Sequence, residues 1–296
     1  MHRPLKALGQ ILLYLAATVL AGALLAPPLY WLAHALAWHL HSAWLSGFVE
    51  KTDFQRYFHR AVTITALLLL WPLMRALKIG NLGYDIGLRP DRWGKERLLA
   101  GFLTSLLTLL ILGGIFLLTG VYRMHSQIPY GKLAWLPVTA VVVAVIEEFL
   151  FRGVLQGTIR RTAMDGFSLM AVAVLFAAVH FLSPAGANPP AVYWWSGLKL
   201  LPDALGQFRN PALLLGGFTT MLVIGIILGY ARLRTRSLWM PVGLHIGWII
   251  GKGMLEVTRQ SVAWPWLGPD ILIGLAPLIT VLITWGIVWY MIKDVR

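Results

Sequence analysis

The chain alternates long apolar runs with short polar segments, and the runs have the length of membrane-spanning helices. A helix needs about 20 consecutive apolar residues to cross the hydrocarbon core of a bilayer. Runs of this kind occupy residues 7–32, 58–77, 97–119, 132–157, 167–181, 211–231, 237–255 and 270–292. The pattern therefore predicts an all-α, polytopic transmembrane helical bundle with about eight spans.

Composition agrees with a membrane protein. Of the 296 residues, 58% are hydrophobic and 12% are charged, and the mean hydropathy is +0.72. A soluble domain carries roughly a quarter charged residues, so this chain has too few to cover a surface that faces water. The sequence contains no cysteine, which excludes disulfides, thiolate catalysis and zinc–thiolate sites.

The basic residues predict how the chain is oriented. The run at 7–32 is longer than the apolar core of a signal peptide, so we expect an uncleaved first helix. The net charge is +13. If the N-terminus is cytoplasmic and eight spans alternate, most Lys and Arg residues lie on the cytoplasmic side, as the positive-inside rule requires. We therefore expect a multi-pass protein of the bacterial inner membrane with both termini cytoplasmic. The basic residues suit lipid headgroups rather than nucleic acid.

Two polar segments have no single interpretation. Residues 78–96 are basic and carry Trp93, which fits either a segment lying along the membrane surface or a solvated loop. Residues 182–210 are rich in Pro, Gly and Trp. They could form a re-entrant segment or a lid.

The span at 132–157 interrupts its apolar pattern with Glu147, Glu148 and Arg152. A charge at the bilayer centre costs at least about 2.5–3.5 kcal/mol, so these residues need partners or a function. Glu148 and Arg152 are four residues apart, in the favourable order for an ion pair on one helix face. Glu147 is rotated by about 100° from Glu148 and has no partner in its own helix. We therefore predict that Glu148–Arg152 is a structural pair and that Glu147 reacts.

Two histidines, His180 and His245, lie inside predicted spans. Measured from the cytoplasmic ends of their spans, Glu147, His180 and His245 all lie roughly 12–20 Å deep. A carboxylate and two imidazoles at one level suit hydrolysis. The carboxylate can act as a general base, while the imidazoles orient water or donate to the oxyanion of a tetrahedral intermediate.

At these residues the sequence resembles the CPBP or Abi family of intramembrane proteases, which includes the type II CAAX prenyl endopeptidases and bacteriocin-processing or immunity proteins. Its motif EExxxR stands at residues 147–152, FxxxH runs from Phe176 to His180, and HxxxN/D begins at His245. The resemblance covers about 132–255, with a weaker similarity at residues 87–89. It implies that Glu147 activates water with the assistance of His180, and that His245 stabilises the oxyanion.

The sequence departs from the third motif at Ile249, where the family has Asn or Asp. An aliphatic side chain cannot donate a hydrogen bond to an oxyanion. His245 would have to act alone, or Trp248 Nε1–H or a backbone N–H would substitute, or activity is weakened or lost. One missing donor costs about 10²–10³ in rate.

The resemblance divides the chain into three parts. Residues 1–131 are N-terminal transmembrane helices with the basic cytoplasmic loop, 132–255 form the protease-like core, and 256–296 carry the C-terminal loop and last helix. The leading hypothesis is an endopeptidase without an essential metal that cleaves near the cytoplasmic face. Its substrate would be a CAAX-type or other membrane-proximal peptide, or a membrane-anchored protein.

Three alternatives remain open at this point. The first is a zinc protease in which Glu147, His180 and His245 hold the metal, since one carboxylate and two imidazoles are a known catalytic set. The second is a non-catalytic scaffold or immunity protein, which Ile249 favours. The third is a proton-coupled transporter, because buried Glu and His residues also form proton relays. The sequence indicates neither the oligomeric state nor whether a substrate is prenylated.

Overall fold

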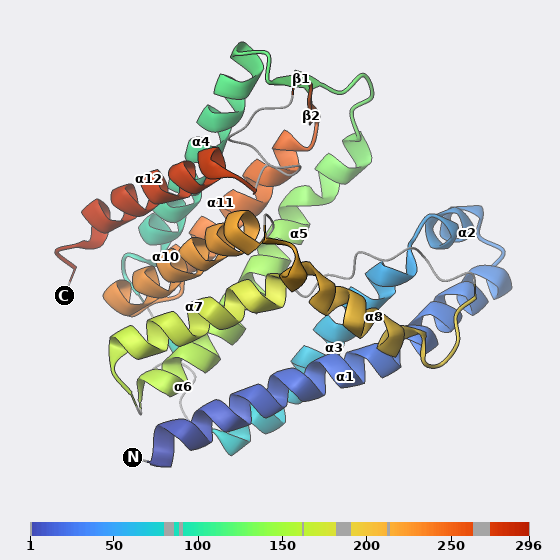
Figure 1. Cartoon of the computed structure of the whole chain (residues 1–296), viewed down its shortest axis with the longest axis horizontal. Coiled ribbons are helices and arrows are strands. Elements are labelled where there is room, and N and C mark those ends of the chain that lie inside the picture. Colours follow the sequence, from blue (N-terminus) through green and yellow to red (C-terminus); the bar gives the residue numbers. More distant parts are fainter. Residues whose placement is uncertain are drawn as a thin grey trace. The chain divides into compact units, whose positions relative to one another are not determined.

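The computed structural model describes residues 2–79, 86–88, 91–161, 163–181, 191–211, 214–262 and 273–295 (Figure 1). Most of them are helical. The α-helices are α1 (His2–His39), α2 (Ala43–Glu50), α3 (Phe54–Ala76), α4 (Gly94–Leu118), α5 (Tyr130–Glu148), α6 (Gly157–Arg160), α7 (Asp165–Phe181), α8 (Ser196–Gly206), α10 (Thr219–Thr235), α11 (Trp239–Leu255) and α12 (Leu275–Ile292). Shorter elements are the π-helical turns η2 (Phe149–Gln156) and η4 (Leu214–Phe218), the 3-10 turn η3 (Gln207–Arg209), and strands β1 (Tyr122–Met124) and β2 (Thr258–Gln260).

Each of the eight predicted runs contains a helix, so the predicted fold class is confirmed. Among the described residues, six helical runs are long and apolar enough to cross a membrane: Lys6–His39, Phe54–Ala76, Gly94–Leu118, Tyr130–Arg160, Leu214–Thr235 and Leu275–Ile292. The helices α7 and α11 are shorter, with 17 residues each. In the part of the chain that the structure describes, six helical runs are thus long enough to span a membrane, and the two shorter helices carry His180 and His245.

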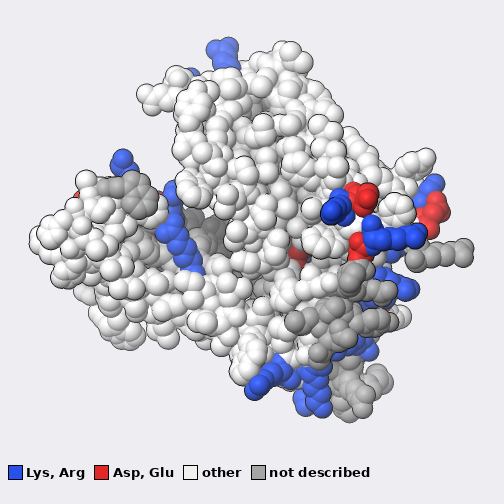
Figure 2. Space-filling model, turned by 180° about the vertical axis from the view of Figure 1, so that it is seen from behind, with Lys and Arg blue, Asp and Glu red and all other residues white. Residues whose placement is uncertain are grey.

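The helices expose apolar side chains as lipid-facing helices do. Leu13 is 70% exposed, Leu68 is 67% exposed and Ile111 is 62% exposed, each on a different helix. Contiguous exposed apolar surface of this kind is rare in soluble monomers. On the face shown in Figure 2, charged side chains gather in small groups with wide uncharged areas between them. The chain is an integral membrane protein.

The first of two compact units comprises residues 1–79 and 181–210. In it α1 packs against α3 and α8, around a core of Ala23, Ala26, Phe54, Tyr57, Phe58, Ala61 and Leu200. The segment predicted as a re-entrant loop or a lid contributes α8 and η3, whereas its residues 182–190 lie outside the described residues. The choice between those two interpretations stays open.

The second unit comprises residues 80–180 and 211–296, and its closest helix packing joins α4 to α11. Gly243, Gly247 and Gly251 recur every fourth residue of α11 and face α4. A Cβ atom at Gly243 would lie 2.1 Å from the carbonyl oxygen of Leu98, and one at Gly247 would lie 2.1 Å from Ser105 Oγ. Small residues spaced by four allow membrane helices to approach this closely. The glycine face of α11 therefore meets α4, and His245 projects from another face.

A two-stranded antiparallel ribbon, which the all-helical prediction did not contain, joins the ends of α4 and α11. Its strands β1 and β2 pair Tyr122 with Gln260 and Met124 with Thr258. Beside it, His125 N–H donates to Val257 O at 2.8 Å. The ribbon is three residues long in each strand, and short paired segments give little hydropathy signal.

Asp91 fixes the start of α4. It belongs to the predicted basic loop, whose residues Arg89 and Pro90 lie outside the described residues. One carboxylate oxygen accepts from the backbone N–H of Trp93 at 3.0 Å, and the other pairs with Arg97 at 2.6 Å. Arg97 also donates to Thr235 O, at the end of α10. Burial raises the pKa of Asp91, but the hydrogen bonds from Trp93, Ser237 and Arg97 outweigh it and hold that pKa below its ordinary value.

The glycine face of α11 gives a stability prediction. Gly243→Ala adds one methyl group that overlaps the α4 backbone, and overpacking of this kind costs about 1–3 kcal/mol. Gly114→Ala is the matched control, because nothing lies within 4 Å of a Cβ at that position of α4. We expect Gly243→Ala to lower the unfolding temperature in detergent while Gly114→Ala leaves it unchanged or raises it. Equal effects would contradict close packing at Gly243.

Asp91 gives a prediction on pH. Because its folded-state pKa is depressed, its contribution to stability is present above its ordinary pKa of 3.8 and is lost as the pH falls through the folded value. Asp91→Asn should therefore lower the free energy of unfolding by about 1–2 kcal/mol at neutral pH, with a smaller difference near pH 3. Denaturant titrations of both proteins in detergent measure this. A difference that does not change with pH would show that the charge of Asp91 is not responsible.

Candidate active site

The helix that carries the two glutamates widens immediately after them. The α-helix α5 ends at Glu148 and continues as the π-helical turn η2 and then as α6, in one unbroken run. Such wide turns are frequent at functional sites. The sequence analysis assumed a regular helix here, and only the polar residues Arg152 and Gln156, four apart in an apolar run, hint that this turn meets a polar partner. That partner is the backbone of α10, since Gln156 Nε2 donates to Gly229 O at 3.1 Å.

The predicted ion pair between Glu148 and Arg152 is present and buried. Arg152 Nη1 lies 2.8 Å from Glu148 Oε1, and both side chains are 0% exposed. The guanidinium also donates to Gly225 O at 3.4 Å and lies 4.2 Å from the centre of the Phe176 ring. Charge pairing, a carbonyl acceptor and a cation–π contact together offset the large cost of removing the guanidinium from water.

Glu148 has a second partner that the sequence did not reveal. His245 Nδ1 lies 2.8 Å from the same oxygen, Glu148 Oε1. Because Glu148 is paired with Arg152 as a carboxylate, it can only accept, so His245 Nδ1 carries the proton. The hydrogen bond thereby fixes the tautomer of His245 and leaves Nε2 as its second functional nitrogen. That nitrogen lies 3.8 Å from Glu147 Oε2.

His180 is fixed in the same way by a different acceptor. Its Nδ1 lies 2.9 Å from the backbone oxygen of Phe176, and a carbonyl oxygen can only accept. Nδ1 therefore carries the proton, and Nε2 lies 3.5 Å from Glu147 Oε2. The Phe176 ring packs against His180 with 4.2 Å between ring centres and meets the His245 ring edge to face at 6.0 Å. Phe176 thus contacts both imidazoles and Arg152.

Glu147 lies at the centre of this arrangement. Its Oε2 is buried and has no hydrogen-bond partner among the described residues, while the side chain as a whole is 28% exposed. With both Nδ1 atoms protonated, neutral His180 and His245 direct lone pairs toward a carboxylate oxygen. Three acceptors that face one another require a donor between them. Water fits this need, since its two hydrogens can be donated to Glu147 and to one imidazole at once.

The zinc alternative rests on the same three residues and stays open, since three facing acceptor atoms are also groups that a metal ion can bind. Within the described part of the chain, no group of three or more His, Asp or Glu side chains is arranged so that it could hold a metal ion.

Trp248 and Ile249, where the sequence departs from the third motif, have different surroundings. Trp248 is 7% exposed, and its Nε1–H has no acceptor among the described residues. Ile249 lies one helical turn beyond His245, in the wall of an apolar cavity. Trp248 thus retains an unused donor close to His245 in the chain, whereas Ile249 contributes only apolar surface.

Comparison with known proteins identifies the region that contains all of these residues. Residues 129–250 match the model of the family described as type II CAAX prenyl endopeptidase Rce1-like. No curated protein and no solved structure matches the chain. The match confirms the family that was predicted from the three motifs, and it includes Glu147, Glu148, Arg152, His180 and His245. The three-part division of the chain and the roles of these residues stay predictions.

The buried ion pair generates a prediction about stability. Arg152→Met leaves the Glu148 carboxylate buried without its cation, which should cost about 3–5 kcal/mol. The double variant Glu148→Leu/Arg152→Met removes both charges and should recover most of that loss. Arg160→Met is the matched control, because it breaks the exposed ion pair with Asp165, and such pairs contribute about 0–1 kcal/mol. Unfolding in detergent measures all three, and a double variant as unstable as Arg152→Met would contradict the interpretation.

Proposed function

Because residues 129–250 belong to the type II CAAX prenyl endopeptidase Rce1-like family, we propose that this chain is an intramembrane endopeptidase in which Glu147 activates water. Proteolysis is the chemistry of the family. The observation that carries the assignment to Glu147 is its buried Oε2, which lies within 3.8 Å of two imidazole nitrogens whose tautomers are fixed. A carboxylate between two such acceptors is suited to accept a proton from water.

In the proposed reaction, water donates one hydrogen to Glu147 Oε2 and the other to His180 Nε2. These two hydrogen bonds aim a lone pair of the water oxygen at the carbonyl carbon of the substrate. As the carbon–oxygen bond forms, the first proton moves to Glu147. The peptide C–N bond then breaks, and Glu147 returns this proton to the departing nitrogen. Glu147 thereby acts first as a base and then as an acid, with no net change in its charge.

We assign the oxyanion to His245. For this role His245 takes up a second proton, on Nε2, before it donates to the oxyanion, while its Nδ1–H continues to donate to the Glu148 carboxylate at 2.8 Å. Ile249 cannot donate, so the donor that the family motif has at this position is missing. We propose Trp248 Nε1–H as the second donor, because it is buried and has no acceptor among the described residues. Glu148 and Arg152 support His245 and do not contact the substrate in this mechanism.

The proposed substrate is a membrane-anchored protein or a membrane-proximal peptide, CAAX-type or other. We further propose that the reaction occurs near the cytoplasmic face of a bacterial inner membrane, without a metal cofactor. Two basic residues, Arg160 and Arg161, lie at the end of the α5–α6 helical run that is nearer to Glu147, and one, Lys132, lies at the other end. Basic residues mark the cytoplasmic ends of spans. The same residues would contact anionic lipid headgroups, and no nucleic-acid partner is proposed.

Glu147→Gln tests the proposed function directly. The substitution is nearly isosteric and removes the base, so hydrolysis of a peptide substrate in liposomes should fall by at least about 10²–10⁴-fold. Mass spectrometry of the released fragments measures the rate. Glu50→Gln, at an exposed position at the end of α2, is the matched control and should cleave at the rate of the unmodified protein. The unfolding temperature of Glu147→Gln should be unchanged.

Three results would contradict this assignment. If Glu147→Gln cleaves as fast as Glu50→Gln, Glu147 is not the base. If a chelator abolishes cleavage and added Zn²⁺ restores it, the reaction is that of a zinc protease. A stable Glu147→Gln protein that supports every cellular phenotype would instead identify a scaffold or immunity role.

A further inference from the structure

One buried arginine of the second unit has no acidic partner among the residues that the structure describes. Arg232 lies in α10 and is 5% exposed. Its Nε atom is buried without a hydrogen-bond partner, and no described carboxylate pairs with its guanidinium. A buried charge is costly unless a counter-charge and hydrogen bonds compensate it. Arg232 therefore requires an anion that the described side chains do not supply.

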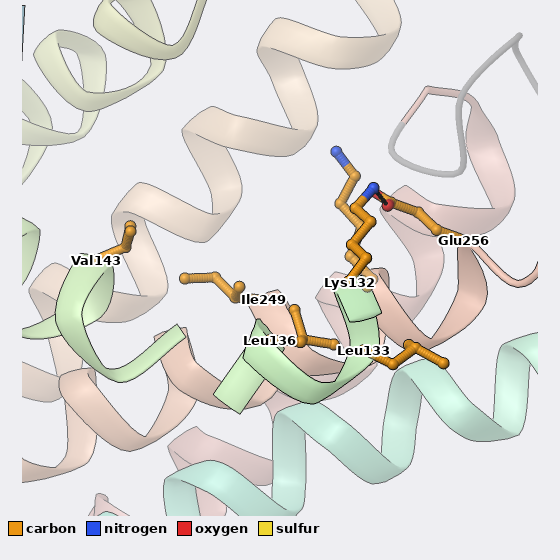
Figure 3. A pocket seen from close by; sticks show the side chains of 8 residues that line it. Lys132, Leu133, Leu136, Val143, Ile249 and Glu256 are labelled. Atoms are coloured by element: carbon orange, nitrogen blue, oxygen red, sulfur yellow. Dashed lines mark hydrogen bonds and ion pairs between the residues drawn. The ribbon is translucent and has the colours of Figure 1, made fainter. Parts of the chain in front are cut away.

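Other basic residues of the same unit are paired with carboxylates. Figure 3 shows one such ion pair, between Lys132 and Glu256. Further pairs are Arg97–Asp91, Arg152–Glu148 and Arg160–Asp165. Arg152, which is as deeply buried as Arg232, also has a carbonyl oxygen and an aromatic ring beside its guanidinium. The surroundings of Arg152 show what a buried guanidinium of this protein requires, and Arg232 lacks its equivalent.

The guanidinium of Arg232 lies against the backbone of the segment at 86–88, which carries the weaker similarity to the family. Gly87 has a φ of +87°, and a Cβ at this position would lie 2.6 Å from Arg232 Cζ. Both the backbone conformation and the close approach of the guanidinium therefore require glycine here. The carbonyl oxygen of Gly87 accepts from the backbone N–H of Leu238. The segment thus holds the guanidinium in place without supplying a negative charge.

The helical run of α5, η2 and α6 lies beside α10 and has the same direction there. Arg152 donates to the carbonyl oxygen of Gly225, and Gln156 donates to that of Gly229. Each step of four residues along one helix is thus matched by a step of four along the other. The next turn of both helices should therefore also lie side by side.

That next turn brings a second guanidinium close to the first. Arg160 comes four residues after Gln156, and Arg232 comes three residues after Gly229. The charges of Arg160 and Arg232 are close enough to repel each other. Asp165 pairs with Arg160 at 2.9 Å, but this carboxylate is 61% exposed and does not neutralise Arg232. Two neighbouring guanidinium groups with one exposed carboxylate leave an excess of positive charge at this point.

Both arginines lie at the ends of membrane-spanning runs. Arg160 is the last residue of the run Tyr130–Arg160, and Arg232 is three residues before the end of the run Leu214–Thr235. Three residues of helix correspond to about 4.5 Å. The headgroup region of a bilayer is roughly 5–7 Å thick on each side. The two guanidinium groups therefore lie at the depth of lipid phosphates.

We propose that Arg232 and Arg160 form a binding site for a phosphate group, which the headgroup of a membrane lipid supplies. A guanidinium presents paired N–H donors that match two phosphate oxygens. The bound anion compensates the buried charge of Arg232 and the repulsion between the two arginines. Inorganic phosphate has the same chemistry, so both sources are compared below. Neither arginine takes part in the proposed hydrolysis, and the inference does not depend on that function.

Thermal unfolding in detergent tests the phosphate site. The protein is freed of lipid in phosphate-free buffer and is titrated with phosphatidylglycerol, with diacylglycerol of the same acyl chains, or with inorganic phosphate. We expect phosphatidylglycerol to raise the unfolding temperature by about 2–5 °C. Diacylglycerol, which lacks the phosphate, should leave it unchanged. A rise with inorganic phosphate alone would support the phosphate site and overturn the lipid as its source.

Arg232→Met distinguishes a binding role from a structural one. The substitution keeps an unbranched side chain and removes the buried charge. Without lipid, the variant should unfold at the same temperature as the unmodified protein or at a higher one, because no uncompensated charge stays buried. Its affinity for phosphatidylglycerol should fall at least about tenfold. Arg236→Gln is the matched control, since it removes one positive charge from an exposed position near the end of α10 and should keep the affinity.

Two results would overturn the proposal. If Arg232→Met binds phosphatidylglycerol as tightly as Arg236→Gln does, Arg232 does not hold the phosphate. If lipid-free Arg232→Met unfolds at a clearly lower temperature than the unmodified protein, Arg232 is compensated within the protein and needs no ligand. If Arg232→Met cannot be purified, Arg160→Gln takes its place in the titration. It should weaken the binding of phosphatidylglycerol severalfold, and unchanged binding would overturn the site.

Discussion

Arg152 places a permanent charge where water is excluded, and the elements around it are arranged to satisfy that charge. Glu148 supplies the counter-charge one turn away, α10 supplies the carbonyl of Gly225, and α7 supplies the ring of Phe176. Arg152 Nε is buried without a hydrogen-bond partner among the described residues, so losing any one of these partners would add to an existing cost. Three helices are thereby held to one point. Two of these partners also position the histidines. Glu148 accepts a hydrogen bond from His245, and the backbone oxygen of Phe176 accepts one from His180.

The helix α11 both packs against α4 and positions His245, and it does so with different faces. One face carries glycines and lies against α4 at backbone contact distance, while another presents His245 to Glu148. Because the glycine face has no side chains to adjust, the rotation of α11 about its axis is fixed by the α4 backbone. His245 is therefore held in the orientation in which its Nδ1 donates to Glu148. The separation of packing and chemistry onto different faces explains how a 17-residue helix carries both.

Much of this arrangement was predictable from local sequence. The apolar runs predicted the helices, the spacing of Glu148 and Arg152 predicted their ion pair, and depth along the spans predicted that Glu147, His180 and His245 lie near one another. What could not be predicted depends on contacts between distant segments. The bond from His245 to Glu148 joins residues 97 positions apart, and the wide turn η2 depends on how Arg152 and Gln156 meet α10. The glycines at 243, 247 and 251 were a readable signal of close helix packing that hydropathy alone does not register.

The number of residues in the wide turn η2 determines how the two glutamates of α5 are oriented relative to Arg152 and Gln156. A π-helical turn holds one more residue than the α-helical turn it replaces, so the chain from Phe149 to Gln156 contains a residue that ordinary helix geometry does not need. Deleting one residue between Glu148 and Arg152 would shorten their spacing from four positions to three, which on a regular helix turns Arg152 by about 100° relative to both glutamates. A change in the length of this segment therefore disturbs the site more than the exchange of one apolar side chain for another of similar volume, which costs less than about 1.5 kcal/mol. Related chains that keep this chemistry are therefore constrained in the residue count between their glutamates and the polar residues that follow, even where the apolar residues between them differ.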